Sequence, residues 1–378
     1  MVEESGRSSL GDIAGLFLRL GLTAFGGPAA HLGLMEREAV TRRRWMSRES
    51  FLDLVGACNL LPGPSSTQVA MALGYTRLGW LGLVTAGVCF IVPAALATLG
   101  LAWAYVRFGS LPQAQGLLYG AKPAMVALIT QAVWKLGRTA LKNTWLAAAG
   151  AVCFAAALLG APPLAVLLVC GGAMLAIAWV RRKPSTAMGL ALLPMGMGGG
   201  TAAAIGLWPL FLVFLKLGVV VFGSGYVLLA FLQRDLVDRL HWVTQGQILD
   251  AVTAGQVTPG PLFATATFLG YLIGGWGGAA VATVAIFMPS FVLAGMAAML
   301  AGRIRRSALA GAFLDGVNVA AVAVMASVAI TLGRAALVDV WTWGMGLACV
   351  GLLIGTKVNP AWLILGGAGV GLLAHGLR

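Results

Sequence analysis

The sequence NLLPGPSSTQ occupies residues 59–68, and a second version of it, QVTPGPLFAT, follows at residues 256–265. Each version lies within an apolar segment long enough for a helix, at residues 51–75 and 248–271. Proline lacks an N–H group and clashes with the preceding turn, so Pro-Gly-Pro cannot continue a helix. The two stretches therefore predict two apolar segments that are broken at matching points.

The two breaks belong to a repeat that covers nearly the whole chain. Residues 17–64 align with residues 214–261 without a gap, and after the loss of one residue the match continues through Pro93 and Pro289. The unmatched stretch between the copies is rich in Gly, Pro and Met. We predict an N-terminal repeat, a linker and a C-terminal repeat, at residues 1–180, 181–207 and 208–378.

Composition places both repeats in a membrane. Of the 378 residues, 60% are hydrophobic and only 10% are charged, whereas a soluble protein carries about a quarter charged residues. In a soluble protein the net charge of +13 would suggest a nucleic-acid partner. Here the basic residues gather in short loops between apolar runs, which is typical of the cytoplasmic loops of a multi-pass protein of the bacterial inner membrane. We therefore expect the lipid bilayer, and no nucleic acid, as a partner.

The basic loops also indicate that the two halves are inverted. The segment with Pro-Gly-Pro either returns to its own side as a re-entrant hairpin or crosses as a broken helix. If it returns, each half crosses about five times and every strongly basic loop lands on one face, as the positive-inside rule requires. If it crosses, Arg181–Lys183 lies outside. We expect an all-α polytopic membrane protein with two inverted homologous halves, the pattern of many secondary transporters. Duplication without alternating access is the alternative.

The backbone after each Pro-Gly-Pro is the best candidate for an anion site. A helix that starts there offers free N–H groups and roughly half a positive charge. Two such starts from inverted halves would face one dianion near the bilayer midplane. The alternative is that Pro and Gly only permit bending. The predicted substrate-binding residues at the breaks are Asn59, Pro62, Gly63, Pro64, Ser65, Ser66, Thr67, Gln68, Gln256, Thr258, Pro259, Gly260 and Pro261.

A second interruption lies in the first apolar segment of each half. Glycine permits close backbone approach, so this interruption is either a further part of the site or a helix–helix contact. The candidate residues here are Phe25, Gly26, Gly27, Phe222, Gly223, Ser224 and Gly225.

Three cations lie within apolar segments, where charges are expensive and usually functional. Arg19 and Lys216 occupy matched positions, whereas the repeat partner of Lys122 is Asn318. We predict that the three cations balance the charge of a bound anion. The alternative for the matched pair is snorkelling to the interface.

Two matched acids, Asp53 and Asp250, begin the broken segments. Each is a candidate to carry a coupling proton, or to form an interfacial ion pair with Arg37 or Arg234. Glu36 and Glu38, on either side of Arg37, are interpreted as part of a solvated loop face.

No metal, cofactor or enzymatic chemistry is expected. The three histidines and five cysteines lack ligand-like spacing. Neither a nucleophile–base pair nor a phosphate-binding loop is present in the sequence. An ATP-driven pump and a membrane-embedded reductase are therefore disfavoured.

Several motifs together resemble the two halves of CHR-family chromate transporters. They are Phe17–Pro28, Asn59–Pro64 with Gln68, Phe214–Gly218, Phe222–Tyr226 and Gln256–Pro261. The resemblance covers nearly the full length, although family members often have a third Gly where this chain has Ser224. It implies a bacterial plasma-membrane protein with antiparallel halves that exports chromate. It also leaves sulfate and other oxyanions as alternative substrates, because members of the family are not all chromate resistance proteins.

We therefore expect a secondary transporter that exports chromate by alternating access, driven by the membrane potential or a proton gradient. With the cell interior negative by 100 mV each charge is worth about 2.3 kcal/mol, so a departing dianion gains roughly twice that. The alternatives are an importer of sulfate or another oxyanion and a passive anion channel. Whether the protein forms a homodimer is left open.

Overall fold

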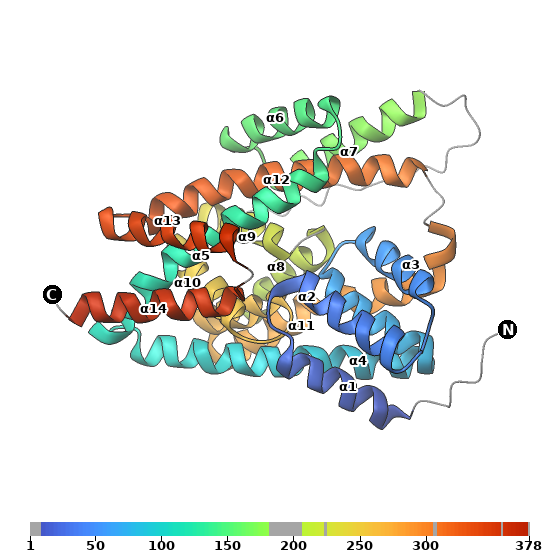
Figure 1. The fold of residues 1–378 in the computed structure, drawn as a ribbon, viewed down its shortest axis with the longest axis horizontal. Helices are drawn as coiled ribbons and strands as arrows, with labels where there is room; N and C mark the ends of the chain where they lie inside the picture. The colour runs from blue at the N-terminus through green and yellow to red at the C-terminus, as the bar shows by residue number, and fades with distance from the viewer. Residues whose placement is uncertain (1–8, 181–205, 223–224, 305–307, 357, 377–378) are drawn as a thin grey trace.

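The structure, a computed structural model, describes residues 9–180, 206–222, 225–304, 308–356 and 358–376. All regular secondary structure in these ranges is helical (Figure 1). The first half contains α1 (Leu10–Thr23), α2 (Gly27–Glu36), the π-helical turn η1 (Arg37–Arg42), α3 (Arg48–Asn59), α4 (Ser65–Phe108), α5 (Pro112–Ala140), α6 (Thr144–Leu158) and α7 (Pro163–Val180). The second half contains α8 (Leu207–Val220), η2 (Gly225–Val227), α9 (Leu228–Leu232), the π-helical turn η3 (Gln233–Arg239), α10 (Gln245–Val257), η4 (Leu262–Ala264), α11 (Thr265–Ile304), α12 (Ala308–Ala336), α13 (Val340–Gly355) and α14 (Pro360–Gly376).

Apolar helices dominate the described part of the chain, as the composition predicts. Five segments are long and apolar enough to cross a membrane, and they belong to α4, α5, α7, α11 and α12. Many large apolar side chains on these helices are exposed, among them Leu96 and Trp276. In water such a surface would be unfavourable, whereas lipid is its natural solvent.

Helix α4 is a hairpin rather than one straight rod. Its backbone leaves the helical conformation at Leu78 and Gly79, where Gly79 has a φ of 57°. A Cβ atom at Gly82 would lie only 2.1 Å from the carbonyl oxygen of Gly74. In a straight helix these two residues would be about 12 Å apart, so the chain reverses between them.

Helix α11 repeats this reversal in the second half. Its backbone breaks at Gly274 and Gly275. The hydroxyl groups of Thr267 and Thr283, on opposite sides of the break, lie 2.7 Å apart in a hydrogen bond. The two halves thus share a sharp helical hairpin that the sequence analysis treats as two separate segments.

The Pro-Gly-Pro segment of the first half is re-entrant. Trp45 precedes α3, and Arg77 lies at the end of the first arm of α4. The guanidinium of Arg77 lies 5.6 Å from the Trp45 ring centroid, so both ends of the segment are on the same side. Of the two arrangements left open by the sequence, the structure has the hairpin.

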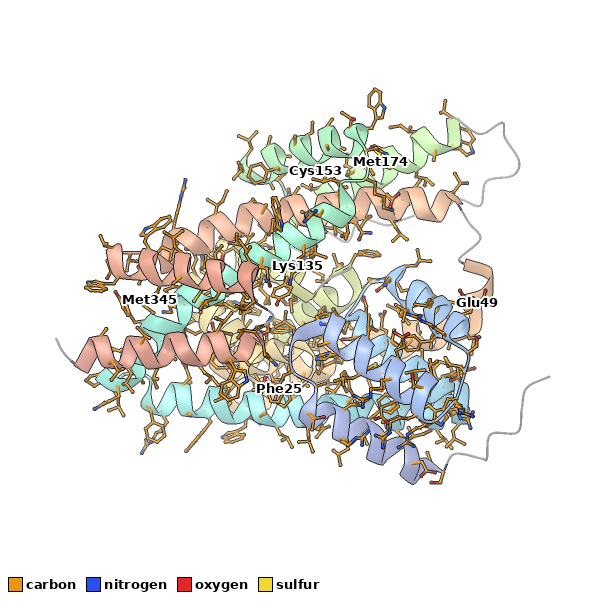
Figure 2. The ribbon with its side chains drawn as sticks, in the orientation of Figure 1. Phe25, Glu49, Lys135, Cys153, Met174 and Met345 are labelled. Atoms are coloured by element: carbon orange, nitrogen blue, oxygen red, sulfur yellow. The ribbon has the colours of Figure 1, made fainter. Side chains whose placement is uncertain are left out.

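The first apolar segment also folds back on itself. Helices α1 and α2 meet at Gly26 and Gly27, whose φ angles of 103° and 79° turn the chain. The guanidinium of Arg19 on α1 lies 2.6 Å from the carboxylate of Glu38, just beyond α2. Figure 2 places Phe25, at the tip of this hairpin, near the middle of the long axis, and Glu49 towards one end. The tip of this hairpin therefore lies near the middle of the long axis of the molecule.

The two halves run in opposite directions. A Cβ atom at Gly137 of α5 would lie 3.7 Å from Val322 of α12, and one at Gly333 of α12 would lie 3.7 Å from Val126 of α5. Val126 and Val322 are repeat partners, as are Gly137 and Gly333. The two contacts are therefore equivalent under the repeat. Between them the residue number rises along α5 and falls along α12, so the two helices are antiparallel. The predicted inversion is confirmed.

The halves also exchange their last helices. Helix α14 packs against α5, and α7 packs against α12. A Cβ atom at Gly120 would lie 2.0 Å from the carbonyl oxygen of Gly367, and the matched pair Gly171 and Gly316 is similarly close. Small residues allow such close approach of helices in membranes. The repeats are thus interlocked and share one large core.

Candidate functional site

The hairpin tips of the two halves are joined by a crossed pair of backbone hydrogen bonds. The N–H of Gly63 donates to the carbonyl of Val221 at 2.6 Å, and the N–H of Gly260 donates to the carbonyl of Ala24 at 3.0 Å. The four residues form two repeat-matched pairs, so each Pro-Gly-Pro turn contacts the end of the first helix of the opposite half. The predicted break residues of both halves therefore meet at one junction.

Glycine is required at the centre of each turn. Gly63 has a φ of 112° and Gly260 a φ of 98°, a region that favours glycine. A Cβ atom at Gly63 would lie 3.0 Å from Ser290 Oγ, and one at Gly260 would lie 2.6 Å from Ala94 Cβ, both in the opposite half. The turns therefore use glycine both for conformation and for close contact across the junction.

Buried polar atoms without a partner gather near these turns. Among the described residues, Thr67 Oγ1, Gln68 Oε1, Gln256 Nε2 and Ser290 Oγ are buried and make no hydrogen bond. Buried polar groups are normally paired because leaving one unpaired costs free energy. Three of these atoms can donate a hydrogen bond and so suit an anion, whereas Gln68 Oε1 is an acceptor and needs a donor such as water.

Two helix starts add backbone donors to the junction. Helix α4 begins at Ser65 directly after Pro64, and η4 begins at Leu262 directly after Pro261. Ser65, Ser66 and Thr67 are all buried. The first N–H groups of a helix have no partner within the helix and carry part of its dipole. Together with the unpaired side chains, these groups form a concentration of donors at the junction.

Three residues that the sequence analysis did not propose also line the junction. His31 lies 3.3 Å from Ser66 Oγ and 3.1 Å from the Ala24 carbonyl, so it ties the first hairpin to the second. Thr98 and Thr258 share a hydrogen bond of 3.2 Å between the halves. Ser290 directly follows Pro289, and that repeated proline was the available signal for it.

The remaining predicted residues of the hairpins are placed differently. Asn59 is exposed, whereas its repeat partner Gln256 is buried. Phe25 is 37% exposed, and Phe222 is half-buried. The predicted residues Gly223 and Ser224 lie outside the described residues.

The matched cations Arg19 and Lys216 are held by matched acids. Arg19 lies 2.6 Å from Glu38, and Lys216 lies 2.6 Å from Asp235, the repeat partner of Glu38. Both acids are buried. In each half this pair fastens the first helix to the turn that follows the first hairpin. In this conformation both cations have an acidic partner.

Glu38 is not part of a solvated loop face, and that prediction was wrong. It is 8% exposed, and it also contacts Arg42 at 2.9 Å and Arg43 at 3.7 Å. Burial raises the pKa of Glu38, but the hydrogen bond from Arg42 and the charge of Arg19 outweigh it, so the pKa is lowered overall. The π-helical turn brings these guanidinium groups to one carboxylate, which periodicity alone does not reveal.

The third cation, Lys122, is not at the junction. Its Nζ lies 3.4 Å from Asp250 Oδ1, and the Tyr105 hydroxyl donates to Asp250 Oδ2 at 3.0 Å. Asp250 therefore forms an ion pair, as one of its two predicted roles requires, but with Lys122 of the other half instead of Arg234.

The geometry of the junction can now be set beside known proteins. The model of the chromate transporter family matches two regions of the chain, residues 11–176 and 208–372. The chain belongs to the chromate transporter family. It is therefore a multi-pass membrane protein of a family of transporters, and its localisation is the inner membrane.

Relatives within the chromate transporter family match over most of their length. The chromate transport protein of Cupriavidus metallidurans is 32% identical over 96% of this chain and 92% of its own. The probable chromate transport protein of Synechococcus elongatus is 32% identical over 90% and 88% of the two chains. The chromate transport protein of Pseudomonas aeruginosa is 33% identical over 89% and 84%. No solved structure matches the chain significantly.

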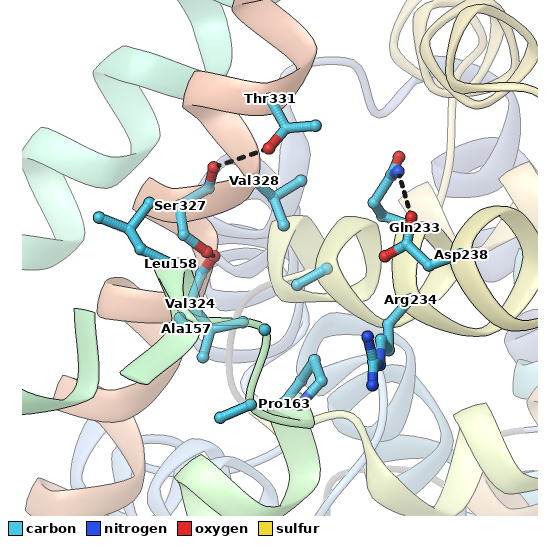
Figure 3. A pocket seen from close by; sticks show the side chains of 13 residues that line it. Ala157, Leu158, Pro163, Gln233, Arg234, Asp238, Val324, Ser327, Val328 and Thr331 are labelled. Carbon is cyan, nitrogen blue, oxygen red and sulfur yellow. Dashed lines mark hydrogen bonds between the residues drawn. The ribbon is translucent and has the colours of Figure 1, made fainter. Parts of the chain in front are cut away.

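This chromate transporter family member also has a polar cavity away from the junction. The cavity has a volume of about 250 Å³ and lies between the α6–α7 loop, η3 and α12 (Figure 3). Its polar lining includes Gln233, Arg234, Asp238, Ser327 and Thr331, and Gln233 donates to Asp238 at 3.0 Å. Residues of both halves thus line the cavity. Along the chain, the short helix α9 connects the η2 turn to η3, which forms one wall of the cavity.

Proposed function

We propose that this protein exports chromate by alternating access around the junction of the hairpin tips. The proposal rests on one observation above all. Donors from both inverted halves, Thr67 Oγ1, Gln256 Nε2 and Ser290 Oγ, are buried without a partner where two helices begin. A tetrahedral dianion offers the acceptors that such a set of donors lacks. The chromate named for the relatives in Cupriavidus and Pseudomonas is a dianion of this kind.

The crossed hydrogen bonds give alternating access a physical form. Each Pro-Gly-Pro turn holds the end of the first helix of the opposite half, at Val221 or at Ala24. The two bonds are related by the inverted repeat. Rocking of the halves would therefore favour one bond while the site is open to one face of the membrane, and the other bond while it is open to the opposite face. The anion would then be exposed first to one face and then to the other.

The membrane potential is sufficient to drive export of a dianion. With the interior negative by 100 mV, moving two negative charges outward gains about 4.6 kcal/mol. Arg19 and Lys216 are fastened to Glu38 and Asp235, so we assign them to positioning the first helix of each half instead of holding the anion. The substrate site consists mainly of helix starts, hydroxyls and amides.

The experiment is uptake of chromate into inverted membrane vesicles, with and without an imposed inside-positive potential. Saturable uptake that the potential stimulates, with chromium remaining as Cr(VI), is expected for an exporter. Sulfate as a competitor ranks the two oxyanions, and conductance without saturation would indicate a channel. Uptake no greater than that of vesicles lacking the protein would refute chromate export.

A further inference from the structure

A buried charge cluster links the two halves outside the junction. Asp250 of α10 is 4% exposed at its side chain and lies 3.4 Å from Lys122 Nζ of α5. Tyr105 of α4 donates its hydroxyl to the other carboxylate oxygen at 3.0 Å. Lys122 is thus the ion-pair partner of Asp250 Oδ1, and Tyr105 is the hydrogen-bond donor to Oδ2. The cluster thus joins one element of the second half to two helices of the first.

The repeat does not reproduce this cluster. The repeat partner of Asp250 is Asp53, which is half-buried, and the position equivalent to Lys122 is Asn318. The pairs of Arg19 and Lys216 are matched in the two halves, whereas no lysine stands at the position equivalent to Lys122. Pairing with a lysine at this place is therefore particular to Asp250, as expected of a task that the transport cycle needs only once.

The position of Asp250 connects its charge to the candidate anion site. Both Asp250 and Gln256 lie on α10. Gln256 follows Asp250 by six residues and is therefore about 9 Å further along the helix. Gln256 carries one of the unpaired donors of the junction. While Asp250 is ionised, it neutralises Lys122. Once Asp250 binds a proton, Lys122 contributes an uncompensated positive charge near the path of the anion.

We propose that Asp250 is the proton-binding site that couples transport to pH, with Lys122 as the charge that protonation releases and Tyr105 as the positioning residue. This inference rests on the proposed anion transport. The proton adds to the carboxylate of Asp250, and no other bond changes. By reciprocity, if protonation strengthens anion binding, a bound anion strengthens proton binding to the same degree. Lys122 from α5 and Tyr105 from α4 are the groups that face the carboxylate.

The first test compares chromate transport by purified protein in liposomes between pH 6 and pH 8. Chromate itself takes up a proton in this range, so each variant is compared with the unmodified protein at the same pH. We expect the ratio of KM values between Asp250→Asn and the unmodified protein to change about tenfold across the range. Lys122→Gln should bind chromate weakly at every pH. A pH-sensitive dye inside the liposomes should report proton movement by the unmodified protein and none by Asp250→Asn.

The matched control is Asp53→Asn, which removes the repeat-equivalent carboxylate. It should keep the pH dependence and the proton movement of the unmodified protein. Loss of both in Asp53→Asn to the same extent as in Asp250→Asn would overturn the assignment to Asp250. So would an Asp250→Asn protein that folds, transports and keeps its pH dependence.

A second measurement needs no substrate and separates this inference from the proposed function. The midpoint of thermal unfolding in detergent is recorded against pH for the unmodified protein and for Asp250→Asn. A proton site at Asp250 predicts a difference between the two midpoints that varies with pH. A constant difference for Asp250→Asn would refute the proton site even if chromate were not the substrate.

Discussion

Replacing Gly260 with alanine tests the junction directly. Gly260 has a φ of 98°, and an L-residue in the left-handed region costs about 1–2 kcal/mol. The new Cβ would lie 2.6 Å from Ala94 Cβ, and forcing extra volume into a packed site costs about 1–3 kcal/mol. We expect a loss of stability of about 2–5 kcal/mol, and a displacement of the turn that holds Ala24.

The assay has two readouts, thermal unfolding in detergent and chromate uptake into inverted vesicles. Transport should fall more steeply than stability, because a shift of about 1 Å in a positioned site can cost on the order of a hundredfold in rate. Gly15→Ala is the control, since a Cβ there meets nothing within 4 Å, and it should leave both readouts unchanged. A Gly260→Ala protein with normal uptake would refute the idea that the crossed turns position the site.

Three further predictions follow from the contacts. Ser290→Ala removes an unpaired buried hydroxyl, so thermal stability should stay the same or rise. The KM for chromate should rise about tenfold, because a hydrogen bond to a charged group is worth about 1.5–3 kcal/mol. An unchanged KM would show that Ser290 does not bind the anion. Lys216→Gln leaves the carboxylate of Asp235 buried without its cation and should cost about 1–3 kcal/mol of stability, a range already reduced because Lys216 is partly exposed. The double variant with Asp235→Asn should regain most of the lost stability. Gly120→Leu should prevent the packing of α5 on α14 and abolish recovery of folded protein, whereas Gly172→Leu, with nothing within 4 Å, should be recovered normally.

Local chemistry predicted the broken segments and their partners in the repeat. Pro62-Gly63-Pro64 and Pro259-Gly260-Pro261 cannot be helical for reasons contained in the residues themselves. The alignment of the two halves then linked every feature of one half to a position in the other. Inversion also followed from sequence, because the positive-inside rule depends on loop charge and not on packing.

The sequence predicts that one apolar segment ends and the next begins near the reversals at Leu78–Gly79 and Gly274–Gly275, but it does not predict how tightly the two arms pack. Neither reversal contains a proline, and glycine is tolerated in a straight helix. The turn depends on close approach between Gly74 and Gly82, residues that only meet after the chain has folded back. The hairpin of α1 and α2 was likewise visible only as a glycine interruption.

Residue type and order are enough to predict a helical membrane protein of two inverted halves, with its irregular backbone at two matched places. Which charges meet depends on how the helices pack. Arg19, Lys216 and Lys122 are three cations in apolar segments, and the sequence predicts the same role for all three, although only the first two occupy matched positions. The fold gives the first two matched acidic partners within their own halves and places the third against Asp250 of the opposite half. An ion pair forms wherever folding brings opposite charges within a few ångströms, and that distance is a property of the packing of helices, not of the order of residues.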